Sequence, residues 1–281
     1  MKRYIILSLL LVSFFAGASA RGTKSLLILH TNDTHSCIEP LKATLADTAI
    51  AGRGGYLRRL RMVREERKNN PHLLLLDSGD FSQGSPYYTM FKGDVEVGLM
   101  NMMGYDAATI GNHEFDFGLE NMARLFRMAK FPIVCANYDF TGTCVEGLVK
   151  PYVVLKRNGI RIGIFGLAPE MRGLVSDKNC EGVKFLDPVA KAQEMADLLR
   201  GKEKCDLVVC ISHLGWSSDN NGDKQLMAKT HGIDIVLGGH SHTFLKEMEY
   251  VKNLDGKDIP NDQNGKSGIY VGRIQIEMKK K

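Results

Sequence analysis

Gly111-Asn112-His113-Glu114-Phe115-Asp116 is the segment around which the rest of this sequence is organised. It places an amide, an imidazole and two carboxylates close together, directly after a predicted strand at 106–110. Four further segments also carry Asp or His: Asp33-Thr34-His35, Gly79-Asp80, Ser212-His213 and Gly238-Gly239-His240-Ser241-His242. Together the five segments supply Asp, Asn and His ligands in the number that two adjacent divalent metal ions require.

The composition is that of a folded globular protein. The chain has 281 residues, of which 44% are hydrophobic and 25% charged, enough for one large domain or two small ones with a sizeable core. The net charge is +5 and the charged residues are not clustered. Nothing therefore favours a nucleic-acid partner, and the basic residues of the predicted helix that ends before Pro71 are expected to form a solvated face.

The first twenty residues have the pattern of a secretory signal. Lys2 and Arg3 precede an apolar run at 5–15, and Ala18-Ser19-Ala20 resembles a cleavage site. The apolar run is too short to cross a membrane easily, so no membrane anchor is predicted. We expect cleavage near Ala20 and a secreted or periplasmic product.

Six cysteines leave two interpretations open. A secreted chain can form disulfides, but the spacing of these cysteines does not determine any pairing. Cys205 and Cys210 flank or lie within an apolar strand, which favours buried free thiols.

Strands and helices are predicted to alternate, which indicates an α/β fold. Nearly continuous apolar runs predict strands that are covered on both faces. Asn158-Gly159 is a hairpin signal between two apolar segments, so antiparallel pairing is expected there. Residues 246–268 are expected to form a loop or a loose hairpin. The predicted strands are 25–30, 72–76, 106–110, 132–136, 206–211, 233–237 and 269–278, and the predicted helices cover 56–70, 95–103, 119–128, 188–200 and 222–231.

The five polar segments share one structural position, because each follows a predicted strand at its carboxyl end. Sites in open α/β sheets are built at that edge, so segments some 200 residues apart are expected to converge. Asp33 and His35 lie two positions apart, as do His240 and His242, and each pair would point the same way in an extended segment. Asp80 could instead cap a helix, and Asn112 could form an Asx-turn.

His113 and Asp116 favour a different role from metal binding. Asp116 is close enough in sequence to accept a hydrogen bond from the His113 ring, and a histidine oriented by a carboxylate can act as a general acid. Asp116 could also cap the following helix, and Glu114 is assigned to local structure. Two adjacent metals would make hydroxide available at neutral pH and neutralise charge on a phosphoryl group, which indicates phosphate-ester hydrolysis. The N/O ligands suit Mn²⁺, Zn²⁺, Fe or Co.

The segment 29–35 and the other four segments together resemble the signature blocks of calcineurin-like metallophosphoesterases. More narrowly, they resemble the catalytic domain of the secreted 5′-nucleotidase family, which includes UDP-sugar hydrolases and cyclic-nucleotide phosphodiesterases. The resemblance spans about 26–276 and implies a four-layer α/β/β/α sandwich. It implies His113 with Asp116 as the catalytic dyad. It also implies one metal held by Asp33, His35, Asp80 and His242, and a second held by Asp80, Asn112, His213 and His240.

The resemblance also sets the expected domains and partners. Residues 21–281 are expected to form a single catalytic domain without the C-terminal nucleotide-binding domain usual in that family. A separate chain could supply that domain, and the substrate would be a nucleotide or small phosphoester. Two alternatives remain: hydrolysis of sulfur or cyclic-phosphodiester substrates at the same site, and a metal-stabilised subunit without catalytic activity.

Overall fold

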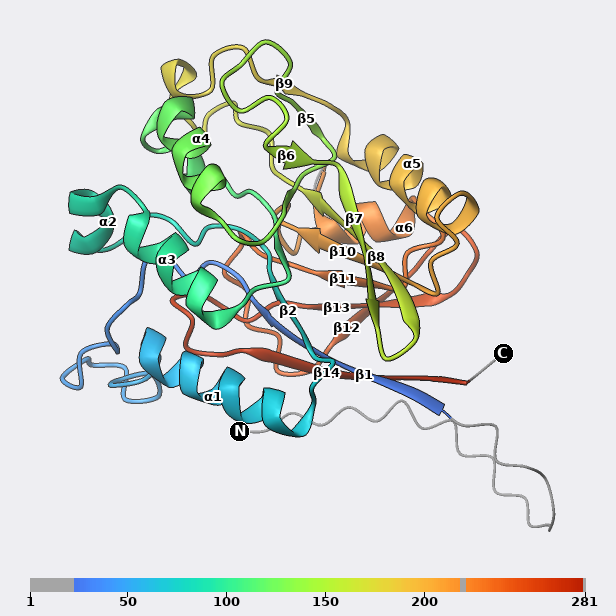
Figure 1. Cartoon of the computed structure of the whole chain (residues 1–281), viewed down its shortest axis with the longest axis horizontal. Coiled ribbons are helices and arrows are strands. Elements are labelled where there is room, and N and C mark those ends of the chain that lie inside the picture. The colour runs from blue at the N-terminus through green and yellow to red at the C-terminus, as the bar shows by residue number, and fades with distance from the viewer. Residues whose placement is uncertain (1–22, 218–220, 280–281) are drawn as a thin grey trace.

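Helices and strands alternate along the chain, as the sequence predicts (Figure 1). The computed structural model describes residues 23–217 and 221–279, so the predicted signal sequence lies outside the described residues. The α-helices are α1 (Tyr56–Asn69), α2 (Pro86–Phe91), α3 (Asp94–Met103), α4 (Gly118–Met128), α5 (Pro188–Gly201) and α6 (Asp223–Ala228). The strands are β1 (Thr23–Thr31), β2 (Leu74–Asp77), β3 (Ala107–Ala108), β4 (Ile133–Val134), β5 (Tyr138–Asp139), β6 (Val149–Lys150), β7 (Tyr152–Arg157), β8 (Ile160–Leu167), β9 (Lys184–Phe185), β10 (Leu207–Ser212), β11 (Ile235–Leu237), β12 (Glu249–Lys252), β13 (Asp258–Asp262) and β14 (Gly272–Lys279).

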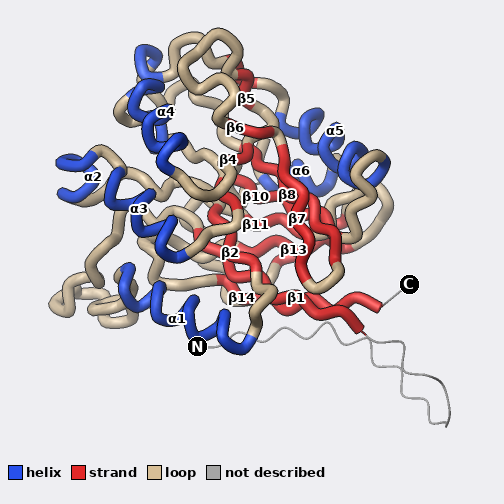
Figure 2. The backbone as a smooth tube through the Cα atoms, in the orientation of Figure 1, coloured by secondary structure: helices blue, strands red, loops and turns tan. Residues whose placement is uncertain are grey.

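Two six-stranded sheets form the centre of the molecule (Figure 2). The first has the order β14-β1-β2-β3-β4-β6, in which only β14 is antiparallel to its neighbour. The second has the order β12-β13-β11-β10-β8-β7 and is parallel from β13 to β8. Helices α1 to α4 lie on one side of the sheets, and α5 and α6 lie on the other (Figure 1).

Three apolar clusters separate the four layers. In β1, Leu27 and Leu29 face the helices of the first layer, whereas Leu26 and Ile28 face the second sheet. The same alternation in β10 divides its side chains between the inter-sheet core and the core beneath α5 and α6. Because neighbouring side chains of a strand point to opposite faces, a continuous apolar run is what a doubly covered strand requires. The predicted α/β/β/α sandwich is therefore confirmed.

Most local predictions agree with the structure. β7 and β8 form the expected hairpin, with Asn158 and Gly159 at φ of 46° and 72°. Residues 246–268 contain a hairpin of β12 and β13. The predicted helix at 222–231 is shorter than expected and ends at Ala228. Helix α2 was not predicted, although Ser85 caps its start and Pro86 occupies its first turn, a recognisable start signal.

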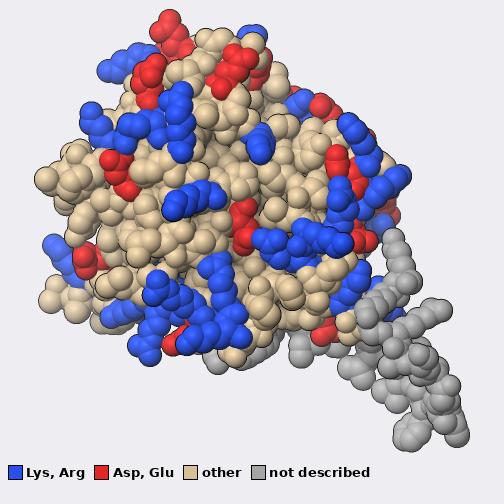
Figure 3. All heavy atoms as spheres, in the orientation of Figure 1, with Lys and Arg blue, Asp and Glu red and all other residues tan. Residues whose placement is uncertain are grey.

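All six cysteines lie in the described part of the chain and are free thiols, and Cys205 and Cys210 are buried. No helix among the described residues is long and apolar enough to cross a membrane. Lys and Arg side chains gather over α1 in Figure 3, and most of them are exposed as predicted. Arg67 is half-buried, and Arg59 is buried, with only 6% of its surface exposed.

Candidate metal centre

The five polar segments converge at the carboxyl ends of strands from both sheets. Those that follow β1, β2 and β3 come from the first sheet, and those that follow β10 and β11 come from the second. The predicted convergence is therefore observed, but the site lies between the edges of two sheets. The metal ligands proposed from sequence all lie in these loops: Asp33, His35, Asp80, Asn112, His213, His240 and His242.

Three overlapping groups of side chains could each hold a metal ion. The first consists of Asp33, His35 and His242 and the second of Asp80, His213 and His240; the third, His35, Asp80 and His113, shares two members with these. In the first, His35 Nε2 lies 2.9 Å from His242 Nε2, and His242 Nε2 lies 3.4 Å from Asp33 Oδ1. This division places His240 and His242 in different groups, as the family resemblance implied.

The first two groups are contiguous. His213 Nε2 lies 3.1 Å from Asp80 Oδ2 and 3.8 Å from Asp33 Oδ1. His35 Nε2 lies 3.9 Å from Asp80 Oδ2, so the Asp80 carboxylate is close to both groups. A carboxylate in this position can bridge two cations, because it has two oxygens that accept separately.

A buried polar atom supports metal binding independently of these distances. Asn112 Oδ1 and His213 Nε2 are both shielded from solvent; Asn112 Oδ1 makes no hydrogen bond, and His213 Nε2 faces the Asp80 carboxylate at 3.1 Å. Buried polar atoms are normally satisfied, so an unpaired Asn112 oxygen beside a cluster of Asp and His side chains fits a cation ligand. The free Asn112 Oδ1 also argues against the alternative that this residue forms an Asx-turn.

The backbone of the ligand loops differs from the expectation. Asp33, His35, His240 and His242 have φ of 47°, 43°, 68° and 54°, so neither pair lies in an extended segment. Each side chain reaches the site because a turn orients it separately. The side chains do converge as predicted, but the expected cause, an extended backbone with alternating side chains, was wrong. Asp80 also has a positive φ, of 54°. Left-handed conformations are costly for non-glycine residues and cluster at functional sites.

Main-chain groups orient the ligands. His213 Nδ1 lies 2.6 Å from the Ser78 carbonyl oxygen, which leaves Nε2 free to bind a metal. Asp33 accepts hydrogen bonds from the His240 N–H, at 3.1 and 3.0 Å to its two oxygens. A side chain on Gly239 would lie 2.8 Å from His213 Nδ1, so the absence of a side chain here lets the backbone approach the site closely.

The electrostatics of the buried ligands favour charged carboxylates beside imidazoles. Burial opposes ionisation of Asp80, but His213 and His113 outweigh it and lower the pKa of this carboxyl. Burial would lower the pKa of His213, but Asp80 and Asp33 outweigh it and raise that pKa to about 10. Burial, reinforced by His213, lowers the pKa of His240 to about 4, which keeps this imidazole neutral as a metal ligand requires.

His113 and Asp116 form the predicted pair at the edge of the cluster. His113 Nδ1 lies 3.1 Å from both oxygens of Asp116, and this hydrogen bond is the main cause of a raised His113 pKa. Helix α4 has no side-chain cap, so Asp116 does not serve as its cap. Both side chains are partly exposed, and His113 lines a groove of about 560 Å³ together with His35 and His242.

Two bracing residues were missed by sequence reasoning. The buried Glu114 carboxylate accepts hydrogen bonds from the N–H groups of Asp80, Ser82 and Gly111, and so joins the loops after β2 and β3. It was assigned to local structure, but two of its partners lie more than 30 positions away. Gln263 similarly accepts from Ser241 Oγ, at 2.8 Å, and from the Thr243 N–H in the loop after β11.

The comparisons with known proteins agree with this geometry. The sequence pattern of the family described as Calcineurin-like phosphoesterase matches residues 26–244. Human 5′-nucleotidase is 35% identical over 277 residues, covering 92% of this chain and 47% of that protein. The trifunctional nucleotide phosphoesterase YfkN of Bacillus subtilis is 32% identical, covering 92% of this chain and 18% of that protein.

Among solved structures, a 5′-nucleotidase precursor from Thermus thermophilus matches with a TM-score of 0.82 and 32% identity, over 90% of this chain and 51% of that one. The chain thus spans about half the length of the 5′-nucleotidases it matches. The family is one of metal-dependent phosphoester hydrolases, so the His and Asp groups described above are candidate sites for divalent ions. The match over most of the chain, together with the fold and the ligand loops, identifies the chain as a member of the calcineurin-like phosphoesterase family.

Proposed function

We propose that this chain is a secreted phosphoesterase with two divalent metal ions that hydrolyses nucleotides or related phosphomonoesters. The observation that carries the proposal is the pair of contiguous ligand groups, close to one Asp80 carboxylate, beside the His113–Asp116 pair. The relatives named as 5′-nucleotidases support a nucleotide as the substrate. Mn²⁺, Zn²⁺, Fe and Co all suit the ligand atoms.

In this proposal the two groups would hold the ions, and the Asp80 carboxylate, which is close to both groups, would serve both. Asn112 Oδ1 completes the group of Asp80, His213 and His240, because it is buried and unpaired. Bound divalent ions would neutralise charge on a phosphoryl group and supply a nucleophile at neutral pH. The protein contributes rigidity, because Ser78, Glu114 and Gln263 fix the loops that carry the ligands.

His113 acts as the proton donor to the leaving group. Asp116 engages Nδ1, so Nε2 is the nitrogen that can face a substrate in the groove. The raised His113 pKa favours the protonated imidazole that a general acid requires. Residues 21–281 form the catalytic unit in this proposal, and export relies on the signal pattern at 1–20.

The test is phosphate release from adenosine monophosphate by the purified chain in Mn²⁺, with and without a chelator. We expect a chelator to reduce release to background and added Mn²⁺ to restore it. Cyclic adenosine monophosphate and a thiosulfonate ester, assayed in parallel, would show a different substrate class by reacting faster. Phosphate release that persists unchanged in excess chelator would overturn the proposal.

A further inference from the structure

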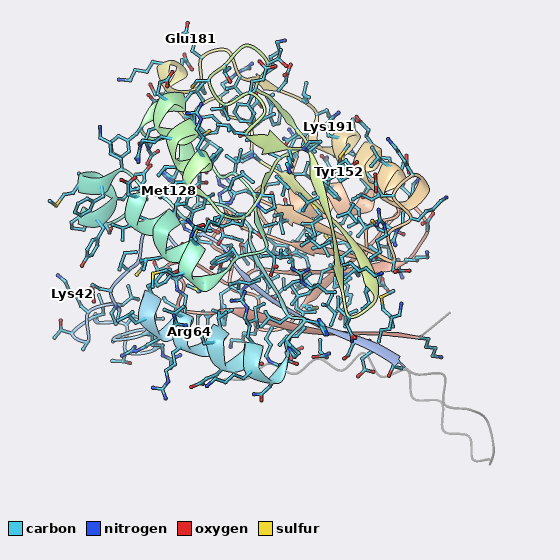
Figure 4. The ribbon with its side chains drawn as sticks, viewed as in Figure 1. Lys42, Arg64, Met128, Tyr152, Glu181 and Lys191 are labelled. Atoms are coloured by element: carbon cyan, nitrogen blue, oxygen red, sulfur yellow. The ribbon has the colours of Figure 1, made fainter. Side chains whose placement is uncertain are left out.

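A second pocket lies beside α1, on the other side of the chain segment that borders the catalytic groove. Its volume is about 340 Å³, and we call it the arginine pocket. Lys266 and Ser267 line the catalytic groove, whereas residues 268–271 line the arginine pocket. Figure 4 labels two residues that help to find this region: Lys42, which lines the catalytic groove, and Arg64 of α1. The lining residues of the arginine pocket are Arg53, Gly54, Arg58, Arg59, Met62, Asn264, Gly268, Ile269, Tyr270 and Val271.

All the charged residues that line this pocket are positive. Three arginines line it, and none of its lining residues is acidic. Within the described ranges, none of the three guanidinium groups forms an ion pair with a carboxylate. Arginine is always charged at physiological pH, so the pocket concentrates positive charge that the protein itself leaves unneutralised.

Arg59 shows that this charge is not merely a solvated surface. Only 6% of the surface of this residue is exposed. Its Nε atom is shielded from solvent and has no hydrogen-bond partner. Its other contacts are to uncharged groups: Nη2 lies 3.4 Å from the Cys37 carbonyl oxygen, and the guanidinium lies 5.2 Å from the Tyr56 ring centroid, within cation–π range. Buried charges are normally paired, so an unpaired buried guanidinium that lines a pocket indicates an anionic ligand.

Two neighbours of Arg59 fit the same interpretation. Gly268 has a φ of 56°, and a side chain there would collide with Arg59 Nη1, so this position keeps the guanidinium in place against the main chain. Asn264 is 2% exposed, and its Oδ1 atom makes no hydrogen bond. A phosphate group in the pocket could accept hydrogen bonds from the arginines through several oxygens.

We propose that the arginine pocket is a binding site for a phosphate group, either as free phosphate or as a phosphomonoester. Arg53 and Arg58 would contact the ligand from the rim and Arg59 from the buried end. The site is separate from the metal centre, but two contacts link it to the ligand loops. Arg59 bonds to the carbonyl oxygen of Cys37, two positions after His35, and the Ser267 N–H donates to the Asp33 carbonyl oxygen at 2.7 Å.

The experiment is equilibrium dialysis of the full Mn²⁺-loaded chain against labelled inorganic phosphate, with two matched double variants. Arg53→Ala/Arg58→Ala removes two exposed lining arginines, which are less critical for folding than Arg59. Arg61→Ala/Arg64→Ala is the control, because both side chains are exposed on α1 outside the pocket and the loss of charge is the same. We expect the first variant to bind one phosphate fewer per chain, with roughly tenfold or greater weakening at that site, and the control to match the wild type.

This readout is a difference between variants, so it does not depend on whether the metal centre binds phosphate. Failure of the proposed nucleotidase activity would leave the difference intact, whereas equal binding by the wild type and Arg53→Ala/Arg58→Ala would overturn the site. Equal weakening by both double variants would overturn it too. Displacement of the label by ribose 5-phosphate would distinguish a phosphomonoester ligand from free phosphate. A crystal soaked in tungstate should show an anomalous peak at the three arginines, and a peak confined to the metal loops would contradict the proposal.

Discussion

The inter-sheet core is built from the strands, and the metal loops follow directly after those same strands. The two regions differ in residue type and in backbone conformation. In β2, Leu74 and Leu76 pack in the inter-sheet core, and Asp80 follows four positions after Leu76. The core is built from side chains that alternate along regular strands. The loops contain buried polar groups, left-handed residues and hydrogen bonds between distant segments. We infer that the core stabilises the fold, whereas the conformations that hold the ligands in place in the loops lower the stability.

The largest expected effect is on chemistry, from a change in the loops alone. His113→Ala should lower kcat for a nucleoside monophosphate by roughly two to four orders of magnitude, because it removes the general acid. The melting temperature should change little, since His113 is partly exposed, and the metal content should change little because the proposed ligand sets do not include His113. His231→Ala is the control, because His231 is half-exposed and lies outside the ligand loops, and it should retain wild-type kcat. A kcat within about threefold of wild type would exclude His113 as the acid.

The converse change lies in the core. Ile164, in β8, is fully buried between the sheets, and Ile164→Ala should lower the free energy of unfolding by about 2–5 kcal/mol. Urea titration would measure this loss, and kcat per folded molecule should be preserved. Leu57→Ala is the matched control, because Leu57 is 76% exposed and its truncation should change stability by no more than about 0.5 kcal/mol. A loss of kcat in Ile164→Ala as large as that in His113→Ala would remove the distinction between the two regions.

An effect that develops only with pH should appear at their boundary, at Asp223. This buried carboxyl accepts from Ser212 Oγ at 2.5 Å, and burial raises its pKa from 3.8 to about 7. The folded state keeps this proton after the unfolded chain has lost it. Its contribution to stability is therefore present below pH 4 and is lost as pH rises toward 7, by at most about 1.4 kcal/mol per pH unit.

Asp223→Asn removes that titration and keeps a side chain of the same shape. Urea titrations between pH 4 and pH 7 should show the wild type losing stability with rising pH more steeply than the variant. Parallel pH profiles for the two proteins would show that Asp223 is already ionised in the folded state throughout this range. The result would then place Asp223 with the ionised carboxylates of the loops.

The sequence alone was sufficient to predict the strands of the core and the residues that meet at the site. Apolar runs such as 25–30 and 206–211 predicted doubly covered strands because strand periodicity is local. The position of polar residues directly after these strands was sufficient to predict that Asp33, Asp80 and His213 meet. The Asn158-Gly159 turn was predicted because its backbone requirement is also local.

The bracing of the site could not be predicted in the same way. Glu114 joins loops more than 30 positions apart, and Asn264 donates its N–H to Asn32 Oδ1 across 232 positions. Such hydrogen bonds leave no periodic signal in the sequence. The left-handed ligand loops were missed because Asp and His at those positions give no cue comparable to glycine.

Two metal ions held side by side by the loops would account for the whole arrangement of the site. The most direct measurement is anomalous diffraction from crystals grown with Mn²⁺, refined with the metal positions free. We expect two ions, one contacting Asp33, His35 and His242 and the other contacting Asn112, His213 and His240, with Asp80 between them. A single ion, or ions that leave Asn112 and His213 unligated, would contradict it.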